Sequence, residues 1–251
     1  MNDLNINWKD FYKNVFSLVV PMALQNLINV GVTAADVVML GKVSEKVLSG
    51  ASLAGQIQYI MVLFLFGLTS GATVLTAQYW GKGDKTTIEK ILALGIRSAV
   101  IVTAIFTVAA FAIPASLMRI FTNDPQVIAE GVKYLRIVAC SYIIMGITNV
   151  YLYVMRSIER VIVATVVYLV SFLCNVIFNA IFIFGLFGFP ALGIRGAAIA
   201  TLIARIVELI LVCGYAKIYN KDVKFRVHYF LHQDKLLVKD FLVYSLSLIH
   251  I

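Results

Sequence analysis

Residues 14–41 of the chain read NVFSLVVPMALQNLINVGVTAADVVMLG, an apolar run that contains a single carboxylate, Asp36. A membrane span needs about 20 mostly apolar residues, and this run is longer than that. An ionised side chain at the centre of such a span costs roughly 2.5 to 3.5 kcal/mol on insertion scales. We therefore predict that Asp36 belongs to a functional site inside the membrane. The competing interpretation is a structural carboxylate that is hydrogen-bonded between two helices.

Polar residues before Asp36 follow a helical spacing. Gln25, Asn29, Thr33 and Asp36 are separated by four, four and three residues, which places them on one stripe of an α-helix. We expect this stripe to face away from lipid. Pro21 lies in the same run, where it removes one backbone hydrogen bond and predicts a bend of the helix.

The composition of the whole chain is that of a membrane protein. Of its 251 residues, 61% are hydrophobic and only 14% are charged, and the mean hydropathy is +0.92. A net charge of +8 is compatible with nucleic acid binding, but the charges lie between apolar runs rather than on one interleaved surface. We therefore interpret the basic residues through membrane topology and expect no nucleic acid partner.

Apolar runs predict six membrane-spanning helices, and hence an all-α membrane protein. Their expected ranges are 14–41, 47–80, 98–118, 137–155, 161–194 and 196–216, and the fifth range includes the turn that follows its helix. An even number of spans places both termini on the same side of the membrane. The segments on that side carry more than twice as many Lys and Arg residues as the segments on the other side. We therefore predict a multi-pass protein of the cytoplasmic (plasma) membrane with a cytoplasmic N-terminus.

The chain is expected to divide into three parts. Residues 1–13 form a cytoplasmic N-terminus, residues 14–219 a six-helix transmembrane lobe, and residues 220–251 a basic cytoplasmic linker with the truncated start of a seventh helix. A weak internal repeat suggests the start of a seventh helix, because KDFLVYSL at 239–246 resembles KDFYKNVFSL at 9–18. Repeated halves are common in secondary transporters, so we expect a second six-helix unit that this chain begins but does not complete.

The fifth span carries a second polar stripe. Tyr168, Ser171, Asn175 and Asn179 are separated by three, four and four residues. A single asparagine between membrane helices often only joins its neighbours, with a contribution of about 0.6 kcal/mol. Two asparagines on one face are equally compatible with a polar pocket, because each amide offers both an acceptor and donors.

The sixth span adds Thr201, Arg205 and Glu208, again on one helical face. Arg205 and Glu208 can pair within the helix, and the favoured interpretation is a self-neutralised pair that lines the bundle. Thr201 then remains available to offer its hydroxyl elsewhere.

Several motifs together resemble the N-terminal half of the multidrug and toxic compound extrusion (MATE) family of transporters. They are the first span with Pro21 and Asp36, GASLAGQI at 50–57, AQYWGKGD at 77–84, and the stretch from Asn175 into PALGIRGAAIAT at 190–201. The similarity covers nearly the whole chain. It implies a twelve-helix antiporter of two six-helix lobes, which exports small organic compounds in exchange for Na+ or H+ and uses no cofactor. The substrate is expected to be cationic or amphipathic, and one lobe alone is not expected to transport, because its cavity lacks the opposite wall.

The resemblance also implies a cation site in this lobe. Related transporters build it from an acid on the first helix, two polar or acidic residues one turn apart on the fifth, and a threonine on the sixth. These positions match Asp36, Asn175, Asn179 and Thr201, and Tyr134 resembles a tyrosine that lies near them. Oxygen atoms from these residues suit Na+, and a desolvated acid suits H+, so either coupling ion remains open. Some relatives have a second carboxylate where this chain has Asn179, which weakens any scheme in which two acids share protons.

Residues expected to line the transport cavity or to gate it are Pro21, Gln25, Asn29, Tyr134, Tyr168 and Arg205. Two alternatives to a drug exporter stay open. A lipid-linked saccharide flippase of the same superfamily needs a more cationic cavity, and a non-transporting membrane scaffold leaves Asp36 with a structural role only. We expect no enzyme, because GKGD at 81–84 lacks the spacing of a phosphate-binding loop and no nucleophile elbow, HExxH motif or paired catalytic carboxylates occur.

Overall fold

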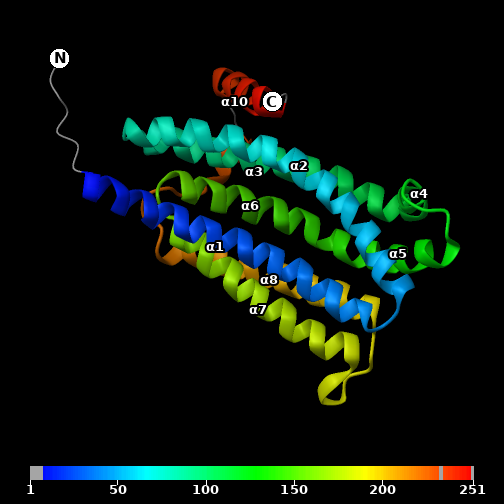
Figure 1. The fold of residues 1–251 in the computed structure, drawn as a ribbon. Helices are drawn as coiled ribbons and strands as arrows, with labels where there is room; N and C mark the ends of the chain where they lie inside the picture. Colours follow the sequence, from blue (N-terminus) through cyan, green and yellow to red (C-terminus); the bar gives the residue numbers. More distant parts are fainter. Residues whose placement is uncertain (1–7, 232–233, 250–251) are drawn as a thin grey trace.

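The protein is a bundle of long helices. The computed structural model describes residues 8–231 and 234–249, and all regular secondary structure within these ranges is helical (Figure 1). The elements are α1 (Trp8–Gly41), α2 (Glu45–Gly81), α3 (Lys85–Ala112), α4 (Pro114–Arg119), α5 (Pro125–Val138), η1 (Ala139–Ser141), α6 (Tyr142–Ser157), α7 (Val161–Phe184), η2 (Leu186–Gly188), α8 (Ile194–Ile218), α9 (Val227–Leu231) and α10 (Lys235–Ile249). Six helical segments are long and apolar enough to cross a membrane: α1, α2, α3, α5 with α6, α7, and α8. The prediction of an all-α protein with six spans is therefore confirmed.

The third span differs from the predicted range 98–118. Helix α3 begins at Lys85, because the Asp84 side chain caps its N-terminus by accepting a hydrogen bond from the Thr87 backbone N–H at 3.0 Å. It ends at Ala112, and Pro114 starts the separate short helix α4. An uncharged run cannot reveal such a beginning, because the first turns of α3 carry charged residues that remain at the end of the bundle.

The fourth span was also predicted too short, at 137–155. It starts at Pro125 and runs to Ser157, with a 3₁₀ turn at 139–141 between α5 and α6. Side chains accompany this change of helix type. The Thr107 hydroxyl of α3 donates to the Ala139 carbonyl at 3.3 Å, and the Ser141 hydroxyl donates to the Val138 carbonyl at 2.7 Å. The irregular backbone is thereby satisfied within the protein, as a membrane interior requires.

Helix α1 is the least covered of the six spans. Only 11% of its most apolar window is buried, against 33% to 61% in the other five. It lies beside α7 (Figure 1) and contacts α2 less extensively. The backbone is one uninterrupted α-helix through Pro21, so the bend predicted at this residue is not a break in the helix.

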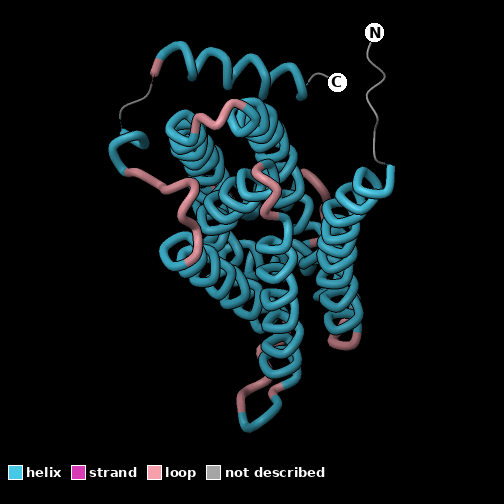
Figure 2. Tube along the Cα trace, turned by 90° about the vertical axis from the view of Figure 1, so that its left-hand side faces the viewer, coloured by secondary structure: helices cyan, strands magenta, loops and turns pink. Residues whose placement is uncertain are grey.

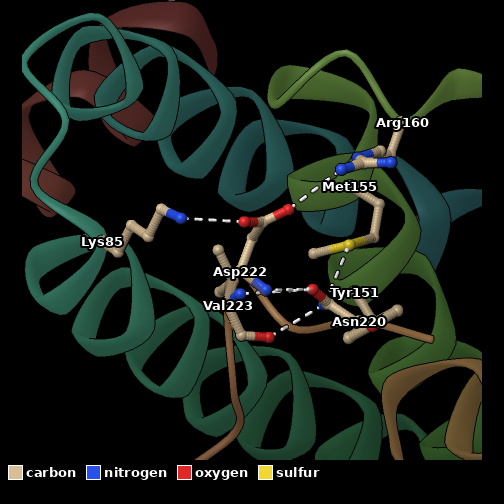
Figure 3. A network of polar contacts seen from close by, with 7 residues as sticks. All are labelled: Lys85, Tyr151, Met155, Arg160, Asn220, Asp222 and Val223. Atoms are coloured by element: carbon tan, nitrogen blue, oxygen red, sulfur yellow. Dashed lines mark hydrogen bonds and ion pairs between the residues drawn. The ribbon is translucent and has the colours of Figure 1, made fainter. Parts of the chain in front are cut away.

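One end of the bundle gathers the α2–α3 turn, the α6–α7 turn and the segment that follows α8, all of which face the viewer in Figure 2. A polar network holds the segment in place (Figure 3). Asp222 accepts hydrogen bonds from Lys85 at 2.8 Å and from Arg160 at 3.0 Å, and Asn220 donates to the Tyr151 hydroxyl at 2.9 Å and to the Val223 carbonyl at 2.8 Å. The end of α8 is thus anchored to both turns.

Helix α10 packs against α2 through Leu237, Phe241 and Ser245, which are buried and recur every four residues. In Figure 2 it is seen from the side, where α2 and α3 are seen nearly end-on, so it crosses them. The division of the chain at residues 13 and 219, and the start of a seventh helix within 220–251, stay predictions.

Candidate cation site and cavity

Asp36 lies in a polar chain that joins three helices. The Asn179 side-chain N–H of α7 donates to Asp36 Oδ1 of α1 at 2.5 Å and also to Asn175 Oδ1 at 3.0 Å. The Asn175 amide donates in turn to Thr201 Oγ1 of α8 at 3.4 Å. Asn175 and Asn179 are 2% and 0% exposed. The four residues that the resemblance implies for a cation site are therefore linked in one chain of hydrogen bonds.

The Asn179 carbonyl oxygen has no hydrogen-bond partner within the described residues, although it is buried. Both N–H groups of the same amide are used, so this oxygen is available as an acceptor. An unpaired buried carbonyl costs free energy unless a cation, a proton donor or water reaches it. This carbonyl oxygen, the Asp36 carboxylate and the Thr201 hydroxyl are all hard oxygen donors, the type of ligand that small hard cations prefer.

The described residues contain no group of three or more His, Cys, Asp or Glu side chains that could hold a metal ion. The candidate ligands are instead one acid, two amides and one hydroxyl. Such a set lacks the several carboxylates, thiolates or imidazoles that divalent and transition metals commonly use. Its chemistry fits a monovalent hard cation or a proton.

A cavity of about 810 Å³ lies beside these residues and is lined by α1, α2 and α5 to α8. Asp36, Asn175 and Thr201 line it, and Asn179 is covered behind them. Among the residues predicted to face a cavity, Asn29, Tyr134, Tyr168 and Arg205 do so. The Tyr168 hydroxyl donates to Asn149 Oδ1 at 3.3 Å, so the polar lining continues onto α6.

Pro21 and Gln25 are not among the described residues that line this cavity. Gln25 is 1% exposed, and its amide donates to the Thr165 hydroxyl at 2.8 Å and to the Val161 carbonyl at 3.2 Å. Its oxygen accepts a hydrogen bond from Arg156. Gln25 therefore links α1 to the beginning of α7 and the end of α6, and its cavity or gating role stays a prediction.

Arg205 and Glu208 form the intrahelical pair expected from their spacing, with 2.7 Å between Arg205 Nη1 and Glu208 Oε2. The structure adds a third member on another helix. The Thr148 hydroxyl of α6 donates to Glu208 Oε1 at 2.6 Å, and Glu208 is 0% exposed. Arg205 lines the cavity, while Glu208 lies behind it.

Several lining residues escaped the sequence analysis. Ser52, Gln56 and Tyr59 of α2 face the cavity, and their spacing of four and three residues is the same signal that marked the stripe on α1. Asn149 and Tyr153 of α6 follow it as well, one turn apart. The spacing of polar residues by three or four positions could have identified these residues. The same spacing could not show that Asn179 is buried behind the cavity wall.

Known proteins resemble this chain in sequence. The family model described as MatE matches residues 21–181. A probable multidrug resistance protein NorM from Thermotoga maritima is 28% identical over 200 residues, which are 78% of this chain and 42% of that protein. A probable NorM protein from Rhizobium meliloti is 26% identical over 211 residues, 84% of this chain and 45% of that protein. The chain thus spans about half the length of the curated relatives it matches.

Solved structures share the fold. A MOP superfamily transporter from Pyrococcus furiosus superimposes with a TM-score of 0.84 at 19% identity, over 95% of this chain and 52% of the other. The match extends over nearly all of this chain and about half of the transporter. At this level of identity, the likeness concerns the fold alone.

Proposed function

Because this chain belongs to the MatE family, we propose that it is the N-terminal lobe of an antiporter that exports organic compounds across the cytoplasmic membrane in exchange for Na+ or H+. The expected division into a cytoplasmic N-terminus at 1–13, a six-helix lobe at 14–219 and a linker with the start of a seventh helix at 220–251 is part of this proposal. A second lobe supplies the opposite wall of the cavity. The names of the NorM relatives support drug export as the activity of the whole protein.

One observation carries the proposal. Asp36 is the one carboxylate among the described residues that line the cavity, and Asn179 donates a hydrogen bond to it. The carbonyl oxygen of Asn179 is buried and has no hydrogen-bond partner in the described part of the chain. A structural carboxylate needs no such free acceptor beside it. A site for a small cation does, because the ion must find oxygen atoms that are not already used.

Exchange follows from the charge of this site. When Na+ or H+ binds at Asp36, the wall loses its net negative charge, and when the ion leaves, the charge returns. A ligand shifts a conformational equilibrium only as far as it binds one conformation better than the other. We propose that the packing of α1 against α7 differs between the two conformations, because α1 is the least covered span and carries Asp36.

The cavity supports small organic compounds as substrates. Its wall combines Tyr59, Tyr134, Tyr153, Tyr168 and other aromatic side chains with amides and hydroxyls. Aromatic faces attract organic cations and stack on flat ring systems. A volume of about 810 Å³ falls within the range of sites that bind drug-sized molecules, about 300 to 1,000 Å³.

Transport by cells that express this chain as part of the complete two-lobe protein tests the role of Asp36. We expect Asp36→Asn to abolish ion-dependent export of an aromatic cation such as ethidium, because an amide keeps the shape but cannot balance the charge of Na+ or carry a proton. The matched control is Glu159→Gln, which removes an exposed carboxylate outside the cavity and should leave export unchanged. Export measured at varied Na+ and pH identifies the coupling ion.

Unchanged export by the Asp36→Asn variant would overturn the proposed role of Asp36 in ion coupling and would leave it with a structural role only. If the unaltered protein exports no organic cation under any Na+ or pH gradient, the exporter proposal itself fails.

A further inference from the structure

Arg205 is a cation in a cavity wall that is otherwise neutral or acidic. Its guanidinium donates one hydrogen bond from Nη1 to Glu208 Oε2, and the other Glu208 oxygen is taken by the Thr148 hydroxyl. Glu208 is fully buried, and the Arg205 side chain keeps 23% of its surface exposed. One edge of the guanidinium is therefore fixed inside the bundle, and the rest of it is presented to the cavity.

The exposed part of the guanidinium has unused donors. A guanidinium carries five N–H groups, and within the described residues the only acceptor bonded to Arg205 is Glu208. The remaining N–H groups can bond only to water or to a ligand in the cavity. Glu208, itself held by Thr148, fixes the orientation of the guanidinium plane. The guanidinium is therefore preorganised to donate hydrogen bonds to a carboxylate with little loss of side-chain entropy.

Arg205 lies one helical turn from the candidate cation site. Thr201, which accepts the hydrogen bond from Asn175, precedes Arg205 by four residues on α8. Side chains at this spacing have Cβ atoms about 5–6 Å apart. The Asp36 carboxylate and the Arg205 guanidinium therefore both face the cavity, close enough together for one small organic molecule to contact both.

The balance of charges selects the ligand. Asp36, Arg205 and Glu208 sum to one negative charge, so a purely anionic compound is repelled, and a purely cationic compound leaves the Arg205 donors unused. A molecule with both charges satisfies both groups. Tyr134 and Tyr168 line the same region and offer ring faces to a flat scaffold between the charges.

We infer that Arg205 is a specificity-determining residue that binds the carboxylate of a zwitterionic aromatic compound while the cationic part of that compound faces Asp36. This inference rests on the proposed function, since it names a substrate class for the same cavity. Glu208 and Thr148 act as positioning residues that orient the guanidinium.

Equilibrium binding to this chain, purified as part of the complete two-lobe protein and placed in lipid nanodiscs, tests the inference with two matched dyes, a cationic rhodamine ethyl ester and the corresponding zwitterionic free acid. Fluorescence polarisation gives both affinities. We expect the unaltered chain to bind the acid about tenfold more tightly than the ester, because a charge-assisted hydrogen bond is gained. A purely anionic fluorescein dye should bind more weakly than either rhodamine.

The variant Arg205→Gln/Glu208→Gln removes the guanidinium without leaving a buried, unpaired carboxylate, and it keeps an acceptor for Thr148. We expect it to lose the preference for the acid while its affinity for the ester stays within about twofold. Arg136→Gln is the control, because this guanidinium is exposed outside the cavity and should affect neither dye. If the double variant does not fold, Arg205→Lys keeps the charge but loses the planar fork, and the preference should fall to about threefold or less.

Equal affinity of the unaltered chain for acid and ester would overturn the inference and leave the proposed function standing. An undiminished preference for the acid in Arg205→Gln/Glu208→Gln would do the same, since the carboxylate would then be bound elsewhere. If the unaltered chain binds neither rhodamine, the proposed function fails and the inference fails with it.

Discussion

At the scale of a single residue, Asn179 shows how a site with one carboxylate differs from a site that has a second carboxylate at this position. Its amide donates to both Asp36 and Asn175, which a carboxylate at the same position could not do. An aspartate there would face Asp36 at hydrogen-bond distance, and the pair would need a shared proton or a cation to coexist. With an amide at position 179 instead, the site carries a single negative charge, and Asn179 contributes a neutral carbonyl oxygen. This single charge supports our proposal that the site exchanges one monovalent cation at a time.

Asp222 makes stability depend on pH at the anchored end of the bundle. The hydrogen bond and charge of Lys85, together with Arg160, hold the pKa of the Asp222 carboxyl below its usual range. Because the pKa is lower in the folded state, the stabilisation is complete above the unfolded pKa of about 3.9 and is lost as pH falls through the lower, folded value. We expect Asp222→Asn to lower the melting temperature of the purified protein at pH 7, and this difference from the unaltered protein should shrink below about pH 4.

Glu159→Gln serves as the comparison for this titration, because Glu159 is exposed and lies in the neighbouring turn. A melting-temperature difference for Asp222→Asn that stays constant from pH 7 to pH 3 would contradict the ion-pair account.

At the scale of elements, α2 and α5 approach each other through glycine. A Cβ atom built on Gly50 would lie 2.8 Å from the Gly131 backbone nitrogen and 2.9 Å from Glu130 Cβ. Small residues let membrane helices pack backbone to backbone, where dispersion and weak contacts replace the hydrophobic effect. The close crossing holds α5 against the beginning of α2 and so fixes the position of Tyr134, which follows Gly131 on α5.

A pair of alanine substitutions on α2 tests this packing. Gly50→Ala should destabilise the protein by about 1–3 kcal/mol, because the added methyl group meets backbone atoms that cannot move aside. Gly55→Ala is the matched control, since nothing lies within 4 Å of a Cβ there and the change raises helix propensity. Thermal or denaturant unfolding in detergent measures both, and a Gly50→Ala protein as stable as Gly55→Ala would show that the two helices can separate without cost.

The distribution of charge belongs to the scale of the whole molecule. Lys82, Lys85, Arg160 and Lys221 lie at the end of the bundle shown in Figure 2, where the segment after α8 is anchored. The positive-inside rule relates such an excess to the cytoplasmic side. The turn at 185–193 lies at the other end and contains Phe187, which is 87% exposed.

Labelling of single cysteines in intact cells tests this orientation. In a background without the native cysteines, a membrane-impermeant maleimide should label Phe187→Cys and leave Lys82→Cys unlabelled until the cells are opened, because only the first position faces outward. The reverse pattern would place the N-terminus outside and overturn the predicted topology.

The sequence alone determined the helical class, the six spans and the polar stripes on three of them. These features are local, since helical period, apolar length and the cost of a buried charge can be read within one segment. The same locality explains the errors: the early turns of α3 and α5 carry charges, so an uncharged run misses them, although Asp84 and Asp124 cap both helices.

Only the tertiary structure decided which stripes meet. Asp36 and Asn179 lie 143 positions apart and are joined at 2.5 Å, and Gln25, on the same stripe as Asp36, bonds to Thr165 and Arg156 instead of facing the cavity. Likewise, the spacing of Arg205 and Glu208 predicted their pair, but not that Thr148 would fix it from another helix. The physical reason is that the rotation and depth of one helix against another depend on the packing of all their neighbours, which no single helix encodes.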